Sequence, residues 1–148
     1  MPPGTGDIQL TLAQNMPVTA AVIVTTPQDL ALADAIKGIA MFNKVDIKVL
    51  GIIENMSYHL CTQCGHKAHI FGADGGQQVA QKYNTELLAQ LPLNIQIREL
   101  ADSGQHFMFN HQADADIQQR YRNLALKLSF KLSQQQSAPQ QIAVSAVN

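Results

Sequence analysis

The stretch AAVIVTTPQDLALADAIKGIAMFNKVDIKVLGII, residues 20–53, decides the fold class because it reads as strand, helix and strand. Residues 20–26 and 48–53 are short apolar runs without polar alternation, which is typical of strands buried on both faces of a sheet. Between them, apolar residues recur at helical spacing as far as about Phe42. Buried strands joined by a helix predict an α/β fold with a parallel sheet covered by helices. The apolar face of the helix consists of Leu32, Ile36 and Ile39.

The start of this helix carries three residue types that favour a helix N-terminus. Thr26 is the predicted N-cap, and Pro27 suits the first turn. Asp29 places a negative charge near the positive end of the helix dipole.

Four further elements follow along the chain. The sequence predicts a helix over 75–84, a strand over 87–91 that Pro92 ends, a short helix over 94–102 and a long helix over 112–132. The long helix has an apolar stripe that we interpret as core packing. The stripe consists of Ile117, Tyr121, Leu124 and Leu128.

Length and charge bound the class of protein. The 148 residues fit one domain over 1–132, and the Gln- and Ser-rich tail over 133–148 is predicted to be disordered. The net charge is −1 and no basic run occurs, so we expect no nucleic-acid or membrane partner. There is no apolar run of about 18 residues and no secretory signal, and we expect a cytoplasmic protein.

Both cysteines of the chain, Cys61 and Cys64, lie in NMSYHLCTQCGHKAHIFG, residues 55–72. Two thiolates cannot complete a tetrahedral metal site, and three hypotheses remain open. A 4Fe–4S cluster needs about four thiolates, which two copies of the chain supply if the cluster bridges a dimer. Alternatively, His66 and His69 complete a zinc-binding structural module, although their spacing is tight. The third hypothesis is a thiol redox pair.

The first seven residues, MPPGTGD, are by themselves only weak evidence for a ligand-binding loop. Gly4 and Gly6 permit close approach of the backbone to a ligand, and Asp7 has a carboxylate that can hold a metal-bound water. A start rich in proline and glycine is also typical of a flexible terminus.

Taken together, MPPGTGD, VIVTTPQDLALADAIKGIAMF, VLGIIENMS, CTQCG and IFG resemble the Mrp/ApbC family of iron–sulfur cluster carrier proteins. These are MinD-like P-loop ATPases, and the resemblance runs in order from Met1 to about Gln105. It implies a mostly parallel sheet flanked by helices, with the CxxC loop as an excursion. It also implies that Cys61 and Cys64 bind a bridging 4Fe–4S cluster in a homodimer, which passes the cluster to apo iron–sulfur proteins.

The resemblance also implies a nucleotide site. MPPGTGD matches the loop that follows the strand of the Walker B-type aspartate, so Gly4 and Thr5 are expected to contact the nucleotide and Asp7 to act in catalysis beside Mg²⁺. Asn55 matches the asparagine that contacts adenine, a base whose edge an amide can both donate to and accept from. Pro27 and Gln28 lie at a second strand end near the nucleotide.

The remaining acidic residues match no motif, and we interpret them as surface or capping residues. They include Asp29, Asp34, Glu54 and Asp74.

One departure from the family is large. The sequence contains no G-x-x-x-x-G-K-[ST] phosphate loop, and Lys37 lies inside a helical pattern. The chain therefore resembles the C-terminal part of such an ATPase, and we expect it to hydrolyse ATP with Mg²⁺ no faster than background. Without the preceding strands, residues 20–26 and 49–53 are expected to expose a sheet edge, which predicts low solubility or dependence on a partner.

Overall fold

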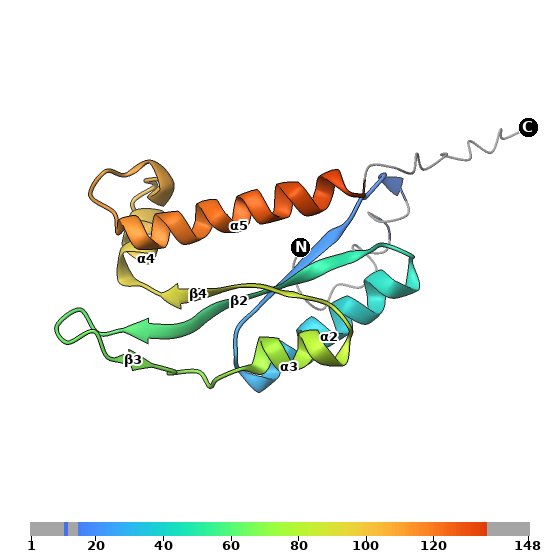
Figure 1. Ribbon diagram of the computed structural model, residues 1–148, viewed down its shortest axis with the longest axis horizontal. Coiled ribbons are helices and arrows are strands. Elements are labelled where there is room, and N and C mark those ends of the chain that lie inside the picture. The colour runs from blue at the N-terminus through green and yellow to red at the C-terminus, as the bar shows by residue number, and fades with distance from the viewer. Residues whose placement is uncertain (1–10, 12–14, 136–148) are drawn as a thin grey trace, which may run out of the picture.

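The computed structural model describes residue 11 and residues 15–135 (Figure 1). The elements alternate between strand and helix, which confirms the predicted α/β class. In chain order they are β1 (Ala21–Thr25), α2 (Asp29–Lys44), β2 (Val49–Leu60), β3 (Lys67–Ala68), α3 (Gly75–Lys82), β4 (Leu87–Leu93), α4 (Ile95–Asp102), the 3-10 helix η1 (Phe107–Phe109) and α5 (Ala115–Ser133).

The sheet is built around β2. Strand β1 lies parallel to β2 on one side, with Thr25 beside Glu54, and β4 lies parallel to β2 on the other side, with Gln90 beside Glu54. The short β3 pairs antiparallel with the end of β2. The sheet is therefore mixed, and β3 is an addition that the apolar pattern did not predict because it is two residues long.

Helices cover both faces of the sheet, with α2 and α3 on one face and α5 on the other (Figure 1). Successive strand residues point to opposite faces. Ile52 is fully buried in the cluster with α2 and α3, whereas Ile53 belongs to the cluster under α5. The predicted stripe of α5 does pack into the core, since Leu124 is buried and Tyr121 and Leu128 pack against its cluster.

Two predicted strand ends were wrong. Strand β2 continues to Leu60, because it keeps pairing with β4 as far as His59 and then with β3. Pro92 lies inside β4 instead of ending it. In the described chain β4 pairs with β2 alone, and an edge strand tolerates proline because one of its sides has no ladder hydrogen bonds to lose.

The predicted cap of α2 was also wrong. Gln28 is the N-cap residue, Pro27 precedes it, and the Thr26 hydroxyl donates to Oε1 of Gln28 at 3.2 Å instead of capping the helix. Asp29 does lie in the first turn, as predicted.

The exposed edge is narrower than the sequence predicts. Residues 49–53 lie between β1 and β4, so the expectation of an exposed edge was wrong for them. Strand β1 does lie at the edge of the described sheet, and Val24 is 63% exposed. The disordered tail was predicted over 133–148, but Ser133 belongs to α5, and residues 136–148 lie outside the described residues.

Candidate functional site

The two cysteines lie at the tip of a hairpin formed by β2 and β3, here called the cysteine hairpin (residues 59–68). The hairpin extends from one end of the molecule, at the left in Figure 1. Its loop is closed by hydrogen bonds from the Cys61 N–H to the His66 carbonyl (3.0 Å) and from the Gly65 N–H to the Cys61 carbonyl (2.9 Å). Gly65 has φ 70°, in the left-handed region that favours glycine, so its place directly after Cys64 lets the chain turn back.

The loop prepares Cys61 to be a thiolate. Hydrogen bonds from the Cys64 N–H, the Gln63 N–H and the Cys64 thiol lower the pKa of Cys61, although burial opposes this effect. Cys61 is half-buried, Cys64 is exposed, and both thiols are free. Because the thiolate is the form that binds metal, this arrangement favours a soft-metal donor pair that a partner can reach.

The two histidines of the predicted zinc module are not gathered around the cysteines. Both His66 and His69 are exposed, and Nδ1 of His69 lies 3.0 Å from the carbonyl oxygen of Ser57. Across residue 11 and residues 15–135, no three His, Cys, Asp or Glu side chains are grouped to hold a metal ion. The described structure thus brings together a pair of donors and no four-ligand site.

The stem of the cysteine hairpin is braced against the sheet. The Lys67 ammonium lies 4.3 Å from the ring centroid of the buried Tyr58, and Nδ1 of His59 lies 3.3 Å from the carbonyl oxygen of Leu93. The first contact joins the two strands that carry the hairpin, and the second joins the hairpin stem to β4.

Three of the predicted nucleotide residues lie at the carboxyl end of β1 and just past the part of β2 that pairs with it. Asn55 follows Glu54, which is the neighbour of Thr25, and Pro27 and Gln28 come just after β1. Pro27 is buried and Gln28 is exposed. The parallel register therefore brings two separate sequence motifs to one end of the sheet. Gly4, Thr5 and Asp7 lie outside the described residues.

Asn55 does not follow β2 but lies inside it, so the expectation that it lies past a strand was wrong. The register of β2 against β4 shifts between Glu54 and Tyr58, and Met56 in this bulge has φ 53°. Oδ1 of Asn55 accepts the N–H of Met56 at 2.9 Å. This bond uses the amide oxygen of Asn55 and leaves its NH₂ group as a hydrogen-bond donor for a ligand.

Glu54 is the residue that the sequence interpretation placed wrongly, because it is fully buried and not a surface or capping group. Its Oε1 accepts the Ser57 hydroxyl at 2.5 Å and the Gln90 amide at 3.0 Å, and its Oε2 accepts the Gly76 N–H at 2.5 Å. Three donors satisfy the carboxyl oxygens of this side chain inside the fold. The one feature of the sequence that hints at the burial of Glu54 is its position directly after the buried run VLGII, residues 49–53.

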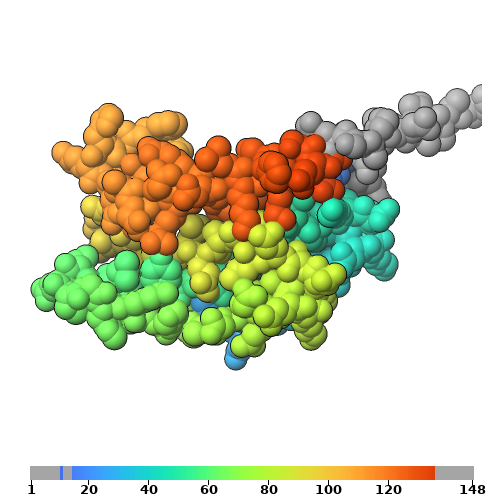
Figure 2. Space-filling model, viewed as in Figure 1, coloured from blue at the N-terminus to red at the C-terminus, as the bar shows by residue number. Residues whose placement is uncertain are grey.

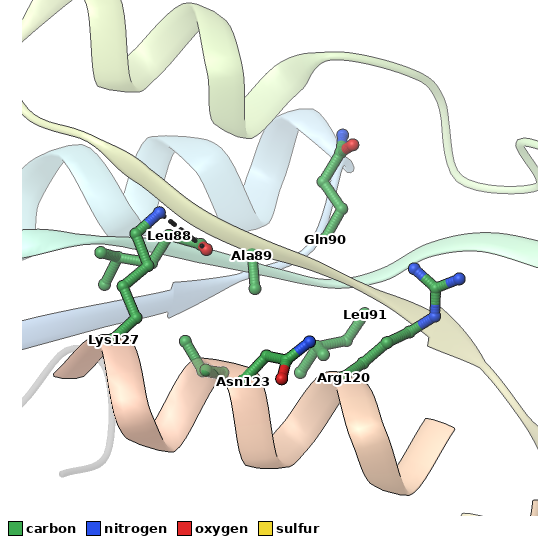
Figure 3. Close-up of a pocket in the computed structure, with 8 residues that line it drawn as sticks. Leu88, Ala89, Gln90, Leu91, Arg120, Asn123 and Lys127 are labelled. Carbon is green, nitrogen blue, oxygen red and sulfur yellow. Dashed lines mark hydrogen bonds between the residues drawn. The ribbon is translucent and has the colours of Figure 1, made fainter. Parts of the chain in front are cut away.

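A hollow of about 220 Å³ lies between β4 and α5 (Figure 3). Its polar lining is already engaged: Lys127 bonds to the Leu88 carbonyl and pairs with Glu86 at 2.5 Å, and Arg120 pairs with Asp116 at 2.9 Å. Gln90 points to the opposite side of β4, toward the Glu54 network (Figure 3). The hollow is therefore a packing feature and offers no unpaired cation.

The ion pairs of Glu86 beside this hollow should make the free energy of unfolding depend slightly on pH. Hydrogen bonds from Lys127 and then Lys131 lower the pKa of Glu86 below its ordinary value of 4.5. The pairing is complete above that value and is lost as the pH falls through the lowered pKa of the folded state. Because Glu86 is 44% exposed, we expect Glu86→Gln to cost about 0.2–1 kcal/mol of unfolding free energy at pH 7. The difference in unfolding free energy between the two proteins, measured in urea, should shrink as the pH falls below 4.5, and a difference that does not change with pH would contradict the assignment.

Comparison with known proteins decides the family. The family model described as "ParA: NUBPL iron-transfer P-loop NTPase" matches residues 1–129. The chain belongs to this family. The Mrp/ApbC resemblance seen in the sequence is therefore confirmed.

Curated relatives of this NUBPL-type NTPase chain carry consistent names. The iron-sulfur cluster carrier protein of Salmonella typhimurium is 54% identical over 99% of the chain, and that of Escherichia coli K12 is 55% identical over 89%. The iron-sulfur cluster transfer protein NUBPL of Mus musculus is 48% identical over 89%. The chain spans 40%, 36% and 41% of these proteins, respectively.

Solved structures agree on the fold of this NTPase family. A nucleotide-binding protein from Archaeoglobus fulgidus in complex with ADP is 40% identical, with a TM-score of 0.61 over 70% of the chain and 43% of its own length. The cell division ATPase MinD of Pyrococcus furiosus has a TM-score of 0.55 over 76% of the chain and 43% of its own length, and at 19% identity it shows the fold alone. Within the described residues, no helix is long and apolar enough to cross a membrane.

Proposed function

We propose that this chain is the cluster-holding part of an iron–sulfur cluster carrier. Cys61 and Cys64 from two copies hold one 4Fe–4S cluster as cargo, and the homodimer delivers it to apo iron–sulfur proteins in the cytoplasm. The supporting observation is the hairpin tip, which offers two free thiols, and hydrogen bonds in the loop lower the pKa of Cys61. In the described chain no three His, Cys, Asp or Glu side chains are grouped to complete a metal site within one copy. The names of the relatives support the same role.

The stoichiometry follows from the donor count. A cubane cluster takes about four thiolates, and one chain supplies two. A two-fold axis through the hairpin tips brings two identical pairs together. A cluster bound at such a tip lies at the surface of both subunits, where an acceptor's thiols can replace the carrier's one by one.

In the complete protein we propose that ATP binding or hydrolysis is linked to cluster loading or delivery. Asn55 donates its amide to the adenine, and Pro27 and Gln28 border the same nucleotide at the neighbouring strand end. Gly4 and Thr5 contact the nucleotide, and Asp7 acts beside Mg²⁺ in hydrolysis. The ADP complex of the Archaeoglobus fulgidus protein supports a nucleotide site in this family.

Anaerobic reconstitution with iron and sulfide tests the carrier proposal. We expect absorbance near ~400 nm and roughly four irons and four sulfides per dimer. Cys61→Ser and Cys64→Ser should each lose nearly all of the bound iron, because a hydroxyl is a poor ligand for the cluster. Thr62→Ala, in the same loop, is the matched control and should retain it.

Sedimentation of the reconstituted protein supplies the second readout. The wild type should sediment as a dimer with the cluster bound and should lose that dimer in both cysteine variants. A reduced chain that stays monomeric and captures no iron would refute the proposal. One zinc per monomer, lost in His66→Ala, would establish the structural module instead.

A further inference from the structure

The cysteine hairpin extends beyond the part of the sheet that supports it. Strand β4 pairs with β2 as far as His59, and past that point, in the described chain, β2 pairs only with the two-residue β3. The tip of the hairpin forms a projection of the molecular surface, in green at the left of Figure 2. An isolated two-stranded hairpin is only marginally stable in water. The direction in which this tip points therefore depends on how the base of the hairpin is held.

A histidine holds the base. His69 is the first residue after β3, and its Nδ1 lies 3.0 Å from the carbonyl oxygen of Ser57 on β2. A carbonyl oxygen can only accept, so Nδ1 carries the hydrogen and donates it. The chain turns directly after this bond: the Gly72 N–H donates to the His69 carbonyl at 3.3 Å, and Gly72 has φ 100°. The histidine bond thus closes the hairpin at the point where the returning chain leaves β2.

Ser57 is itself held from inside the fold. It is buried, and its hydroxyl donates to the fully buried carboxyl group of Glu54. The same carboxyl group also accepts the N–H of Gly76, at the start of α3. The segment from His69 to Gly76 is therefore tied to β2 at both of its ends. The histidine joins the exposed hairpin to a buried, hydrogen-bonded network and not to another surface loop.

We propose that His69 is a positioning residue for cluster binding and not a metal ligand. Its hydrogen bond to Ser57, here called the hairpin latch, keeps the returning chain beside β2 and so holds Cys61 and Cys64 in one direction. This inference rests on the proposed carrier function. A shared cluster needs both thiol pairs aligned at once, so a hairpin that splays loses affinity in each of the two copies. Groups that orient metal ligands typically contribute a factor of about 10–100 to metal affinity.

Hydrogen exchange of the free chain tests the hairpin latch without iron. The Cys61 N–H donates to the His66 carbonyl across the hairpin, so its exchange rate reports on splaying. Loss of one hydrogen bond changes an equilibrium by about two- to tenfold. We expect His69→Ala to speed the exchange of the Cys61 amide by that factor. His111→Ala, at an exposed histidine outside the hairpin, is the matched control and should leave the rate unchanged. Unchanged exchange in His69→Ala would overturn the proposal.

Two conservative variants separate positioning from ligation. An asparagine side chain places its amide N–H where Nδ1 of histidine lies, whereas glutamine places it one bond farther out, where Nε2 lies. His69→Asn should therefore restore both slow exchange and cluster binding, and His69→Gln should restore neither. A neutral carboxamide is a poor ligand for iron. Slow exchange without cluster binding in His69→Asn would thus mark His69 as a ligand and would overturn the proposal.

Anaerobic competition with an iron chelator measures the effect on the cluster. His69→Ala should release iron from the reconstituted dimer at about a tenfold lower chelator concentration than the wild type. Its thermal midpoint should stay within a few degrees of the wild type, because the side chain is exposed. Equal retention of iron by the two proteins would overturn the proposal. A wild type that captures no iron would refute the carrier function, whereas unchanged exchange refutes the latch, so the two failures are distinguishable.

Discussion

Replacing Glu54 with alanine is expected to lower the free energy of unfolding by about 3–5 kcal/mol. The carboxylate is fully buried and accepts hydrogen bonds from Ser57, Gln90 and Gly76. Its removal leaves three donors without a partner inside the fold and opens a cavity, and both effects destabilise. Since a domain of this size is stable by about 5–15 kcal/mol, the loss is a large fraction of the total.

The loss of unfolding free energy should depend on the acceptor oxygens of Glu54 as well as on the volume of its side chain. Glu54→Gln keeps the shape but turns one acceptor into an NH₂ group that faces donors, so we expect a loss of about 2–3 kcal/mol. Glu99→Ala is the control, because that carboxylate is 56% exposed and its change should stay within about 0.5 kcal/mol. Urea unfolding followed by circular dichroism measures all three. A Glu54→Ala loss below about 1 kcal/mol would show that the network contributes little.

Replacing Gly51 with alanine is expected to cost about 3 kcal/mol or more, because the added methyl group has no space. A Cβ at this position would lie 2.5 Å from the carbonyl oxygen of Glu86 and 2.5 Å from Cγ of Leu88. The Glu86 carbonyl cannot move away easily, since it accepts the N–H of Ile52 at 2.8 Å. Relief of the clash would therefore separate β2 from β4 at the point where their pairing begins.

Gly38 provides the matched control for this substitution. It lies in the interior of α2, and a Cβ there would meet Cδ1 of Ile23 at 3.6 Å, an ordinary contact distance. Gly38→Ala should therefore raise the unfolding free energy by about 0.5–1 kcal/mol through helix propensity. In thermal and urea unfolding, the midpoint of Gly51→Ala should fall below that of the wild type, and the midpoint of Gly38→Ala should rise above it. A tolerated Gly51→Ala, with unchanged midpoint, would contradict the close packing of β2 on Glu86.

The candidate site shows where the sequence was informative and where it was not. Cys61 and Cys64 stand out in the sequence because two cysteines two residues apart are a donor pattern by themselves. Glu54 does not stand out, because its meaning depends on Gly76 and Gln90, which lie 22 and 36 residues farther along the chain. No local pattern announces that two distant donors will join the nearby Ser57 in bonding to one carboxylate.

The strand ends show the same limit in another form. Pro92 reads as a stop because proline removes a hydrogen-bond donor, but the cost depends on whether a neighbour strand needs that donor. In the described sheet β4 has one partner, so the strand continues. Likewise, Asn55 reads as a residue past a strand because the apolar run ends, while the pairing of Tyr58 and His59 with β4 carries β2 onward.

Apolar spacing and residue types were enough to predict the α/β order, the parallel strands, the core faces of the helices and the cysteine pair. These follow from apolar spacing and from residue types within a few positions, which local physics links directly to structure. The burial of Glu54 and the extension of β2 to the cysteine hairpin became evident only in the folded chain. Each of these depends on which distant segments become neighbours. Burial, strand pairing and hydrogen bonding are properties of those contacts, so residues close in sequence do not determine them.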